Sequence, residues 1–335
     1  GYARFEFDVT NVWDRSGDNT IEVEATDISA RSQTYGKQGY GEIQGIWQTV
    51  WLEERPQAYL SDFRITTKIT GDVHIAAQVS APDGAVFSAH FDGQHVKAPV
   101  QHGQAELSLH LENPRLWSPD SPHLYEGTLC VEQDGKTDEV CTYFGVREIS
   151  AAQVDGHDFK WILLNGKPIY LNGTLDQAFN PQGYFTYPDE SDIHAEAWRL
   201  KRLGLNMVRI HIKPEEPRKL YWMDRLGILV MEDVPCFWGE PNEEARNAYE
   251  NEWGDIIARD FNHPSIFSWV VFNETWGLFT TKGTVRSYLP ETQEWVRSVY
   301  RRAKALDPTR LVEDNSPCNN DHVESDLNTW HFYKN

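Results

Sequence analysis

The spacing of hydrophobic positions divides the chain near residue 150. Before that point apolar and polar residues alternate with period two, as in residues 5–9, 19–25 and 47–53. Such alternation predicts antiparallel strands with one face toward solvent, because successive side chains of a strand point to opposite faces. The first 55 residues are therefore expected to supply strands to a β-rich unit.

A second β-rich unit is expected after the break at Arg55 and Pro56. Alternating segments recur there with turn-like residues between them, which is typical of a β-sandwich of roughly 90 residues. The expected strands are residues 60–65, 73–79, 105–111, 124–132 and 139–147.

From residue 150 onward, short apolar strands alternate with segments of helical spacing. Near-continuous apolar strands separated by helices predict parallel strands buried on both faces. At least six strands are expected, counting one that ends near residue 333, and this favours a (β/α) barrel over a doubly wound sheet. No glycine-rich phosphate-binding motif follows any of them, so nucleotide binding gains no support. The other expected strands are 169–172, 207–212, 228–231, 266–272 and 310–312, and the expected helices are 190–203, 217–226, 245–259 and 290–305.

The chain has 335 residues and a formal net charge of −20, from 31 basic and 51 acidic side chains. This charge argues against a nucleic-acid partner, which needs a basic face, and against docking on anionic membranes. No apolar run is long enough for a transmembrane helix. The 13 tryptophans weakly favour a carbohydrate protein, since flat rings stack on sugars, although a tryptophan-rich core explains them equally well.

Two of the four cysteines, Cys130 and Cys141, flank a turn-like stretch and are expected on opposite strands of a hairpin. Two buried free thiols are favoured over a disulfide, which would depend on the strand register. No pair of cysteines has CxxC spacing, so a zinc site is not expected.

Polar residues follow nearly every expected barrel strand. Because the carboxyl ends of the strands carry the chemistry of (β/α) barrels, these residues are the candidates for a functional site. They are Asp176 after the first strand, His211 and Lys213 after the second, Asp233 after the third, Asn273, Glu274 and Trp276 after the fourth, and His331 and Tyr333 after the last.

Glu274 is the strongest candidate because it follows the apolar run 268–272. A carboxyl group at the edge of an apolar site has a raised pKa, which a general acid needs near neutral pH. The alternative is a solvated glutamate that caps the next helix. Asn273 beside it could hydrogen-bond a substrate hydroxyl, and Trp276 could form a stacking wall.

Several motifs in order along the whole chain resemble glycoside hydrolase family 2, the family of β-galactosidases, β-glucuronidases and β-mannosidases. Each motif is weak alone, but their order and separations make the resemblance strong. The motifs are residues 45–52, 116–125, 144–147, 164–169, 206–209, 224–230 and 262–266, the last leading into Phe272-Asn273-Glu274.

The resemblance implies a fold of three parts. Residues 1–55 would be the C-terminal part of a sugar-binding jelly roll, 56–148 an immunoglobulin-like β-sandwich, and 149–335 the N-terminal part of a TIM barrel with about six strands. The chain is thus expected to be an incomplete form of a longer enzyme. Its open sheet edges predict poor solubility for this stretch alone.

The resemblance also implies a retaining exo-β-glycosidase, which uses two carboxyl groups about 5 Å apart as acid/base and nucleophile. By resemblance Glu274 is the acid/base and Asn273 contacts the 2-hydroxyl of the sugar. His331 and Tyr333 resemble a region where a family tyrosine lies close to the nucleophile. No nucleophile motif follows Glu274, so the nucleophile is expected beyond residue 335 and this stretch alone is expected to be inactive.

Some of the remaining candidates are expected to contact the substrate, and others are expected to hold the side chains of the site in position. Arg209 is favoured as a residue that orients carboxylates, and Asp233 as a supporting group behind the site. Asp176 is favoured as a contact to a substrate hydroxyl. His211 and Lys213 are evenly balanced between contact and a structural role.

A β-galactosidase-like activity is the leading expectation, with β-glucuronidase, β-mannosidase and α-L-arabinopyranosidase as alternative specificities. A non-catalytic carbohydrate-binding protein of the same fold is the alternative function. No cofactor is identified and no metal site is expected from the sequence, although the resemblance leaves Mg²⁺ or Na⁺ open by analogy. The expected partner is a carbohydrate. Homo-oligomers of the complete protein stay open, and the cellular location is undetermined.

Overall fold

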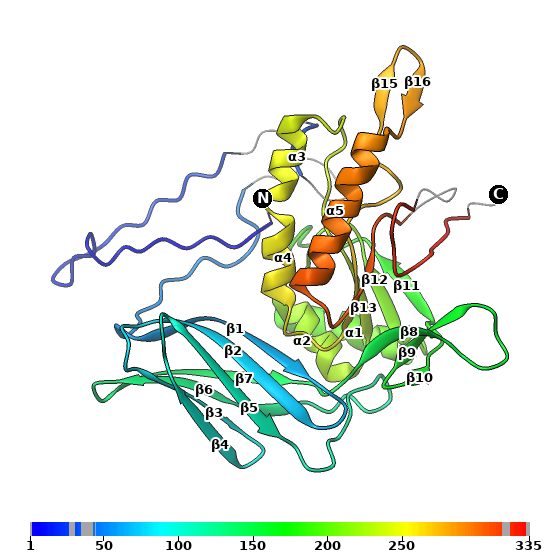
Figure 1. Cartoon of the computed structure of the whole chain (residues 1–335). Coiled ribbons are helices and arrows are strands. Elements are labelled where there is room, and N and C mark those ends of the chain that lie inside the picture. The colour runs from blue at the N-terminus through cyan, green and yellow to red at the C-terminus, as the bar shows by residue number, and fades with distance from the viewer. Residues whose placement is uncertain (1, 27–30, 35–42, 44, 317–321, 333–335) are drawn as a thin grey trace.

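The protein is described by a computed structural model that covers residues 2–26, 31–34, 43, 45–316 and 322–332. Figure 1 shows a β-sandwich packed beside an α/β body, with the N-terminal residues and a small hairpin projecting from them. The change of hydrophobic period near residue 150 marks the passage from one body to the other.

The β-sandwich consists of two antiparallel sheets, with strand orders β1-β2-β5 and β4-β3-β6-β7. Every second residue of β2 and β5 is buried, so the alternating sequence places one face of each strand in the common apolar core. The strands are β1 (Tyr59–Thr67), β2 (Asp72–Ser80), β3 (Val86–Phe91), β4 (Gln94–Pro99), β5 (Gln104–His110), β6 (Tyr125–Gln133) and β7 (Lys136–Phe144).

The five strands expected in this region are confirmed, and β3 and β4 were not expected. The residues of β4 alternate between half-buried and exposed, so this strand lacks a distinct apolar face. β3 carries the same alternation as its neighbours and pairs with both β4 and β6.

β6 and β7 form the expected hairpin, and its register explains the cysteines. Cys130 lies opposite Glu139 and Cys141 lies opposite Thr128, so the two thiols are not directly paired across the ladder. Both are free, as expected. The expected burial is wrong for Cys141, which is exposed, because that part of β7 turns its odd-numbered residues to solvent.

The α/β body contains a parallel sheet with strand order β11-β12-β13-β14-β17 in the described part of the chain. β13 and β14 are buried along their whole length, as their continuous apolar sequence predicts. The helices pack along the outside of this sheet in Figure 1. The strands are β11 (Gly173–Asp176), β12 (Met207–Ile210), β13 (Leu229–Asp233), β14 (Ile266–Val270) and β17 (Leu311–Glu313), and the helices are α1 (Glu190–Arg202), α2 (Pro217–Leu226), α3 (Glu243–Glu250), α4 (Trp253–Asp260) and α5 (Pro290–Leu306).

Three expected elements of this body differ from the structure. The first strand lies at 173–176 instead of 169–172, because residues 173–176 are the ones that pair with β12, Gly173 lying opposite Met207. The helix expected over 245–259 is divided into α3 and α4. No strand forms among described residues 322–332, so the sixth barrel strand is absent from the described sheet.

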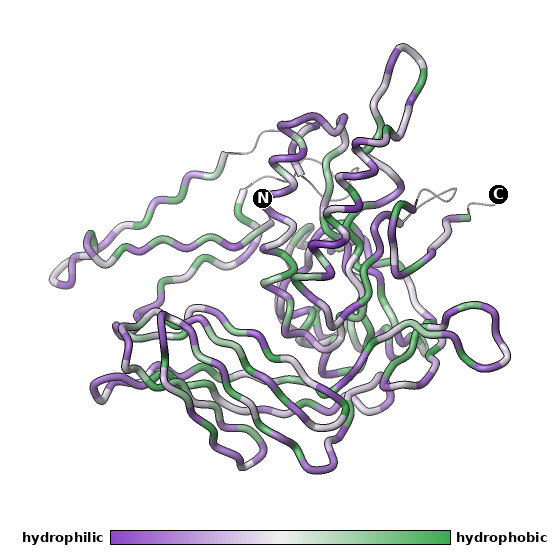
Figure 2. The backbone as a smooth tube through the Cα atoms, in the orientation of Figure 1, coloured by the Kyte–Doolittle hydropathy of each residue, from purple (hydrophilic) through white to green (hydrophobic). Residues whose placement is uncertain are grey.

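The expected strands of the N-terminal segment do not form either. Described residues 2–26 and 45–55 contain no strand, and in Figure 1 the first of these runs outward and back as an arm. Figure 2 shows apolar and polar residues alternating along it, and Phe7 is 79% exposed. Alternation makes a strand only where a neighbour completes the hydrogen-bond ladder, and no strand pairs with this arm among the described residues. The jelly-roll assignment therefore stays a prediction.

A small sheet closes the amino end of the parallel strands. It comprises β8 (Ile149–Gln153), β9 (Lys160–Leu164) and β10 (Lys167–Pro168). Ile149, Leu164 and the buried Trp117 form one apolar cluster with the first residues of the barrel strands, among them Leu229 and Leu311. Because this end is filled by side chains, only the carboxyl ends of the strands are left for a functional site.

Arg147, just after the last sandwich strand, joins the sandwich to the α/β body. Its buried guanidinium donates hydrogen bonds to the carbonyl oxygens of Pro264 (3.0 Å), Ile266 (2.9 Å) and Thr309 (3.1 Å). These carbonyls lie where β14 and β17 begin, so one side chain fixes the amino ends of two barrel strands. Burial, together with the neighbouring charge of Arg310, lowers the pKa of Arg147 to about 9.

Replacing Arg147 with alanine should lower the free energy of unfolding by about 3 kcal/mol, because three buried carbonyls lose their donor. Urea denaturation measures this change. The control is R301A, which removes an exposed guanidinium paired with Glu324 at 2.8 Å and should cost less than about 1 kcal/mol. Equal losses in the two variants would contradict the assigned role of Arg147.

Candidate active site

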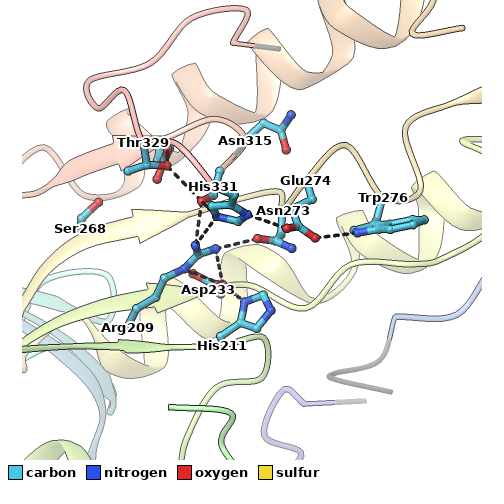
Figure 3. A network of polar contacts seen from close by, with 12 residues as sticks. Arg209, His211, Asp233, Ser268, Asn273, Glu274, Trp276, Asn315, Thr329 and His331 are labelled. Carbon is cyan, nitrogen blue, oxygen red and sulfur yellow. Dashed lines mark hydrogen bonds and ion pairs between the residues drawn. The ribbon is translucent and has the colours of Figure 1, made fainter. Parts of the chain in front are cut away.

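The carboxyl ends of the parallel strands bring most of the expected residues together (Figure 3). Parallel strands end at one edge of the sheet, so residues that are 24 to 122 positions apart in sequence become neighbours. The carboxyl ends of β12, β13 and β14 contribute Arg209, Asp233 and Asn273, and the segment after β17 contributes Ser316 and His331.

Arg209 lies at the centre of this network. Its Nε and one terminal nitrogen donate to the two carboxylate oxygens of Asp233, at 2.9 and 2.7 Å. The same terminal nitrogen donates to Oδ1 of Asn273 at 2.8 Å, and the other donates to Oγ of Ser316 at 2.7 Å. One guanidinium therefore connects the ends of β12, β13 and β14 with the segment after β17.

The surroundings of Asp233 favour its ionised form. Burial alone would raise its pKa, but the charge of Arg209 and the hydrogen bond from His211 (2.5 Å) outweigh it and hold the pKa below its usual value. Nδ1 of His211 faces Asp233, so the other ring nitrogen is left toward the cavity described below. Arg209 and the buried Asp233 thus contact each other at the strand ends, and their expected roles stay predictions.

Glu274 holds its carboxyl group between two contacts. Oε1 faces Nδ1 of His331 at 2.5 Å, and Oε2 accepts a hydrogen bond from the indole nitrogen of Trp276 at 2.9 Å. The Trp276 ring lies 5.4 Å from the Trp238 ring, centroid to centroid. The side chain of Glu274 is 20% exposed, so its carboxyl group is accessible while firmly oriented.

The backbone at Glu274 is strained. Glu274 and Thr275 have φ values of 51° and 60°, in the left-handed region that a β-branched residue such as Thr275 rarely adopts. Hydrogen bonds from their N–H groups to the Ser316 carbonyl (2.9 Å) and the Asn315 side chain (3.0 Å) hold this turn in place. The segment after β17 therefore sets the direction in which the Glu274 carboxyl group points.

Asp176 and Lys213 lie in a separate buried cluster. Asp176 accepts a hydrogen bond from the Ala178 N–H at 2.8 Å and pairs with the buried Lys219. The Lys213 ammonium lies 4.4 Å from the centroid of the Trp47 ring, and its side chain is 2% exposed. Burial lowers the pKa of Lys213. Both side chains are thus held by buried neighbours, and the substrate contact expected for Asp176 stays a prediction.

A cavity of about 470 Å³ opens at the strand ends. Arg209, His211, Glu274 and His331 line it, so four of the expected residues face one space. Asp176 and Lys213 do not line it, and the expected Tyr333 lies outside the described residues. The other lining residues are Leu175, Gln177 and Phe332.

Sequence reasoning missed Ser316, Asn315 and Thr329, which support the site. Ser316 and Asn315 end a polar run after β17, where the same rule about strand ends would have pointed to them. Thr329 carries no such indication, because it approaches the site only through the return of the chain after residue 322.

Two further searches of the described residues found no candidate. No group of three or more His, Cys, Asp or Glu side chains there could hold a metal ion. We derive no step through a Mg²⁺ or Na⁺ ion. No helix in the described part is long and apolar enough to cross a membrane.

The family is established by two family models. The TIM-barrel-domain model of glycosyl hydrolases family 2 matches residues 156–332, and a second model of that family matches residues 57–147. The fold and the site thus define a β-sandwich followed by a TIM-barrel-like domain. The chain belongs to glycoside hydrolase family 2.

Curated relatives bear two different names. A putative β-glucuronidase of Formosa agariphila is 28% identical over 295 residues, covering 83% of this chain and 35% of its own. A β-galactosidase of Thermoanaerobacter pseudethanolicus is 28% identical over 299 residues, covering 81% of this chain and 38% of its own. This chain therefore spans little more than a third of the length of these relatives.

Solved structures support the fold. The apo structure of Bacteroides uniformis β-glucuronidase 3 aligns with a TM-score of 0.67 at 24% identity, covering 79% of this chain and 34% of that chain. At that identity the match concerns the fold alone.

Replacing Asp233 with asparagine should leave the buried Arg209 without its counter-charge and lower the free energy of unfolding by about 3–5 kcal/mol at pH 7. The pKa of Asp233 is depressed in the folded state. Its ionised form therefore contributes stability above the unfolded carboxyl pKa of about 3.9, and the contribution is lost as the pH falls through the folded value.

Urea denaturation of both proteins from pH 7 to pH 2.5 measures this effect. The stability gap between wild type and D233N should be full at pH 7 and narrow below about pH 4. The exposed Asp158 gives the control, since D158N should change stability by less than about 0.5 kcal/mol. A gap that stays constant with pH would contradict the ionised pair.

Proposed function

We propose that this chain is the acid/base-bearing part of a retaining exo-β-glycosidase, with Glu274 as the general acid and base. The observation that carries the proposal is the position of the Glu274 carboxyl group. It lines the cavity at the strand ends and is oriented by His331 on one oxygen and Trp276 on the other. A general acid must be both oriented and accessible to the oxygen it protonates.

The two carboxylate oxygens of Glu274 face different sides of the site. Oε1 and His331 border the cavity, where we place the sugar that is cleaved off. Oε2 faces Trp276, which packs near Trp238. Because the acid protonates the oxygen between sugar and leaving group, the tryptophan side is where we place the leaving group. Asn273, whose side chain accepts a hydrogen bond from Arg209, is the residue that we expect to meet the sugar 2-hydroxyl.

The nucleophile of a retaining enzyme lies about 5 Å from the acid/base. Asp233 is held by Arg209 and His211, and Glu313 is fully buried, so neither is offered to a sugar carbon. We therefore keep the prediction that the nucleophile is not among these residues, and the experiments below use the protein expressed from its complete gene.

The charge around the cavity favours a neutral sugar. Arg209 is the permanent cation among the described lining residues, and Asp233 balances it. Lys213 is enclosed by aromatic rings and does not face the cavity. A carboxylate-bearing sugar would thus meet Glu274 without an uncompensated cation to offset the repulsion. This supports a β-galactosidase-like specificity.

Replacing Glu274 with glutamine keeps the shape of the side chain and removes its acid proton. For a β-glycoside with a poor leaving group, kcat/KM should fall by about 10²–10⁴, while a dinitrophenyl glycoside, which needs little protonation, should lose far less. The exposed Glu291 at the start of α5 gives the control E291Q. Equal rates for E274Q and wild type on the poor leaving group would rule out the acid role.

A panel of 4-nitrophenyl β-glycosides tests the sugar. We expect the β-galactoside to have a higher kcat/KM than the β-glucuronide, because no unpaired cation lines the cavity among the described residues. A preference for the glucuronide would overturn the specificity. If the protein binds sugars but hydrolyses no member of the panel, the proposal of a hydrolase would be wrong, and the carbohydrate-binding alternative would take its place.

A further inference from the structure

A chain of hydrogen bonds joins Glu274 to a second carboxyl group, that of Glu313 at the end of β17. Glu274 faces Nδ1 of His331 at 2.5 Å, and Nε2 of the same ring faces Oγ of Ser316 at 3.2 Å. Oγ of Ser316 faces Oγ1 of Thr329 at 3.1 Å, and this hydroxyl in turn contacts Oε1 of Glu313. Each link is a group that can both give and take a proton.

The contacts of this chain allow two arrangements of its protons. Nε2 of His331 also lies 3.3 Å from the terminal nitrogen of Arg209 that donates to Ser316, and this nitrogen can donate to Nε2 only when Nε2 carries no proton. A hydroxyl donates once and accepts twice, and a neutral imidazole carries one proton on either nitrogen. Ser316 has contacts from Arg209, His331 and Thr329, so it accepts from Arg209 and from one of the other two and donates to the third. Its hydrogen bonds are complete whichever way the chain runs.

We propose that Glu274 and Glu313 share a single proton through His331, Ser316 and Thr329, and that ionised Glu313 keeps Glu274 in its acid form. This inference rests on the proposed acid role of Glu274. In the first arrangement Glu274 is protonated and donates to Nδ1, Nε2–H donates to Ser316, Ser316 donates to Thr329, and Thr329 donates to the Glu313 carboxylate.

The second arrangement is reached when each bridging group passes on one proton. Glu274 gives its proton to Nδ1, Nε2 gives its proton to Ser316, Ser316 gives one to Thr329, and Thr329 gives one to Glu313. The proton count is unchanged, since Glu274 has lost one proton and Glu313 has gained one. The four hydrogen bonds of the chain are then all reversed, while Arg209 still donates to Ser316.

The surroundings of Glu313 let it take up that proton. Its side chain is fully buried, and its Oε2 meets no hydrogen-bond donor among the described residues. Burial raises the pKa of Glu313 to about 7, against the opposing effects of Thr329, Arg209 and His322 and with a small addition from the negative charge of Asp233. Both forms of Glu313 are therefore accessible at neutral pH.

The matched variants T329V and T329S test the chain. Valine has nearly the shape of threonine and lacks the hydroxyl, so it interrupts the chain while both carboxyl groups remain. Serine keeps the hydroxyl. Infrared difference spectra of the protein expressed from its complete gene, titrated from pH 4 to pH 9 and assigned with E274Q and E313Q, follow the carboxyl bands of the two glutamates.

In wild type and T329S the two carboxyl bands should change together, because one proton is shared. In T329V they should titrate independently, with that of Glu274 moving to lower pH by about one unit. Unchanged titration of both glutamates in T329V would overturn the inference. This measurement needs no turnover, so it decides the shared proton even if no glycoside is hydrolysed and the proposed function fails.

Kinetics give the functional test. At pH 7, kcat/KM on a substrate with a poor leaving group should fall about tenfold in T329V and E313Q and stay near wild type in T329S, because the acid form of Glu274 becomes less populated. The loss should become smaller at pH 5, because a higher proton concentration favours the acid form of Glu274 in every variant. A loss that is equal at both pH values would indicate a merely structural role for Thr329 and Glu313 and would overturn the inference.

Discussion

The buried pair of Arg209 and Asp233 is the interaction on which the site depends. A guanidinium in the low-dielectric interior is costly unless its donors are satisfied, and here Asp233, Asn273 and Ser316 satisfy them. These partners come from different strands and from the segment after β17, so the ends of the sheet must stay in register for the cation to be stable. The same requirement holds the side chain of Asn273 just after the end of β14.

The turn at Glu274 shows how packing elsewhere sets the geometry of the site. The left-handed backbone of Glu274 and Thr275 would relax in an isolated loop. It persists because the segment after β17 accepts and donates hydrogen bonds along it, through Ser316 and Asn315. At the other end of the same strands, Arg147 fixes the start of β14 and β17 from the sandwich. The sandwich thus positions the strands whose opposite ends hold the acid.

Much of the fold followed from local patterns, and the failures share one cause. The sandwich strands and most barrel elements could be predicted because the spacing of their hydrophobic residues indicates which face of each element is buried. The N-terminal alternation and the segment near His331 were predicted as strands and are not, because a strand also needs a hydrogen-bonded neighbour, which no local pattern reports. The position of β11 likewise depends on its pairing with β12, which lies more than 30 residues further along the chain.

The sequence by itself determined the candidate residues, because apolar strands followed by polar residues locate the carboxyl ends of a barrel, and Glu274, Asn273, Arg209, His211 and His331 all lie at that end. Only the tertiary structure decided what each of them does. Asp176 and Lys213 have the same sequence context as the others, yet Lys219 and Trp47 enclose them in a buried cluster. Conversely, Glu313 lies at the end of β17 and Thr329 lies in the segment that returns to the sheet after residue 322. The two side chains contact each other at the site. Charge balance and hydrogen bonding depend on which residues are neighbours in space. The order of the strands in the sheet and the path of the returning segments determine those neighbours, and neither can be read from a local sequence pattern.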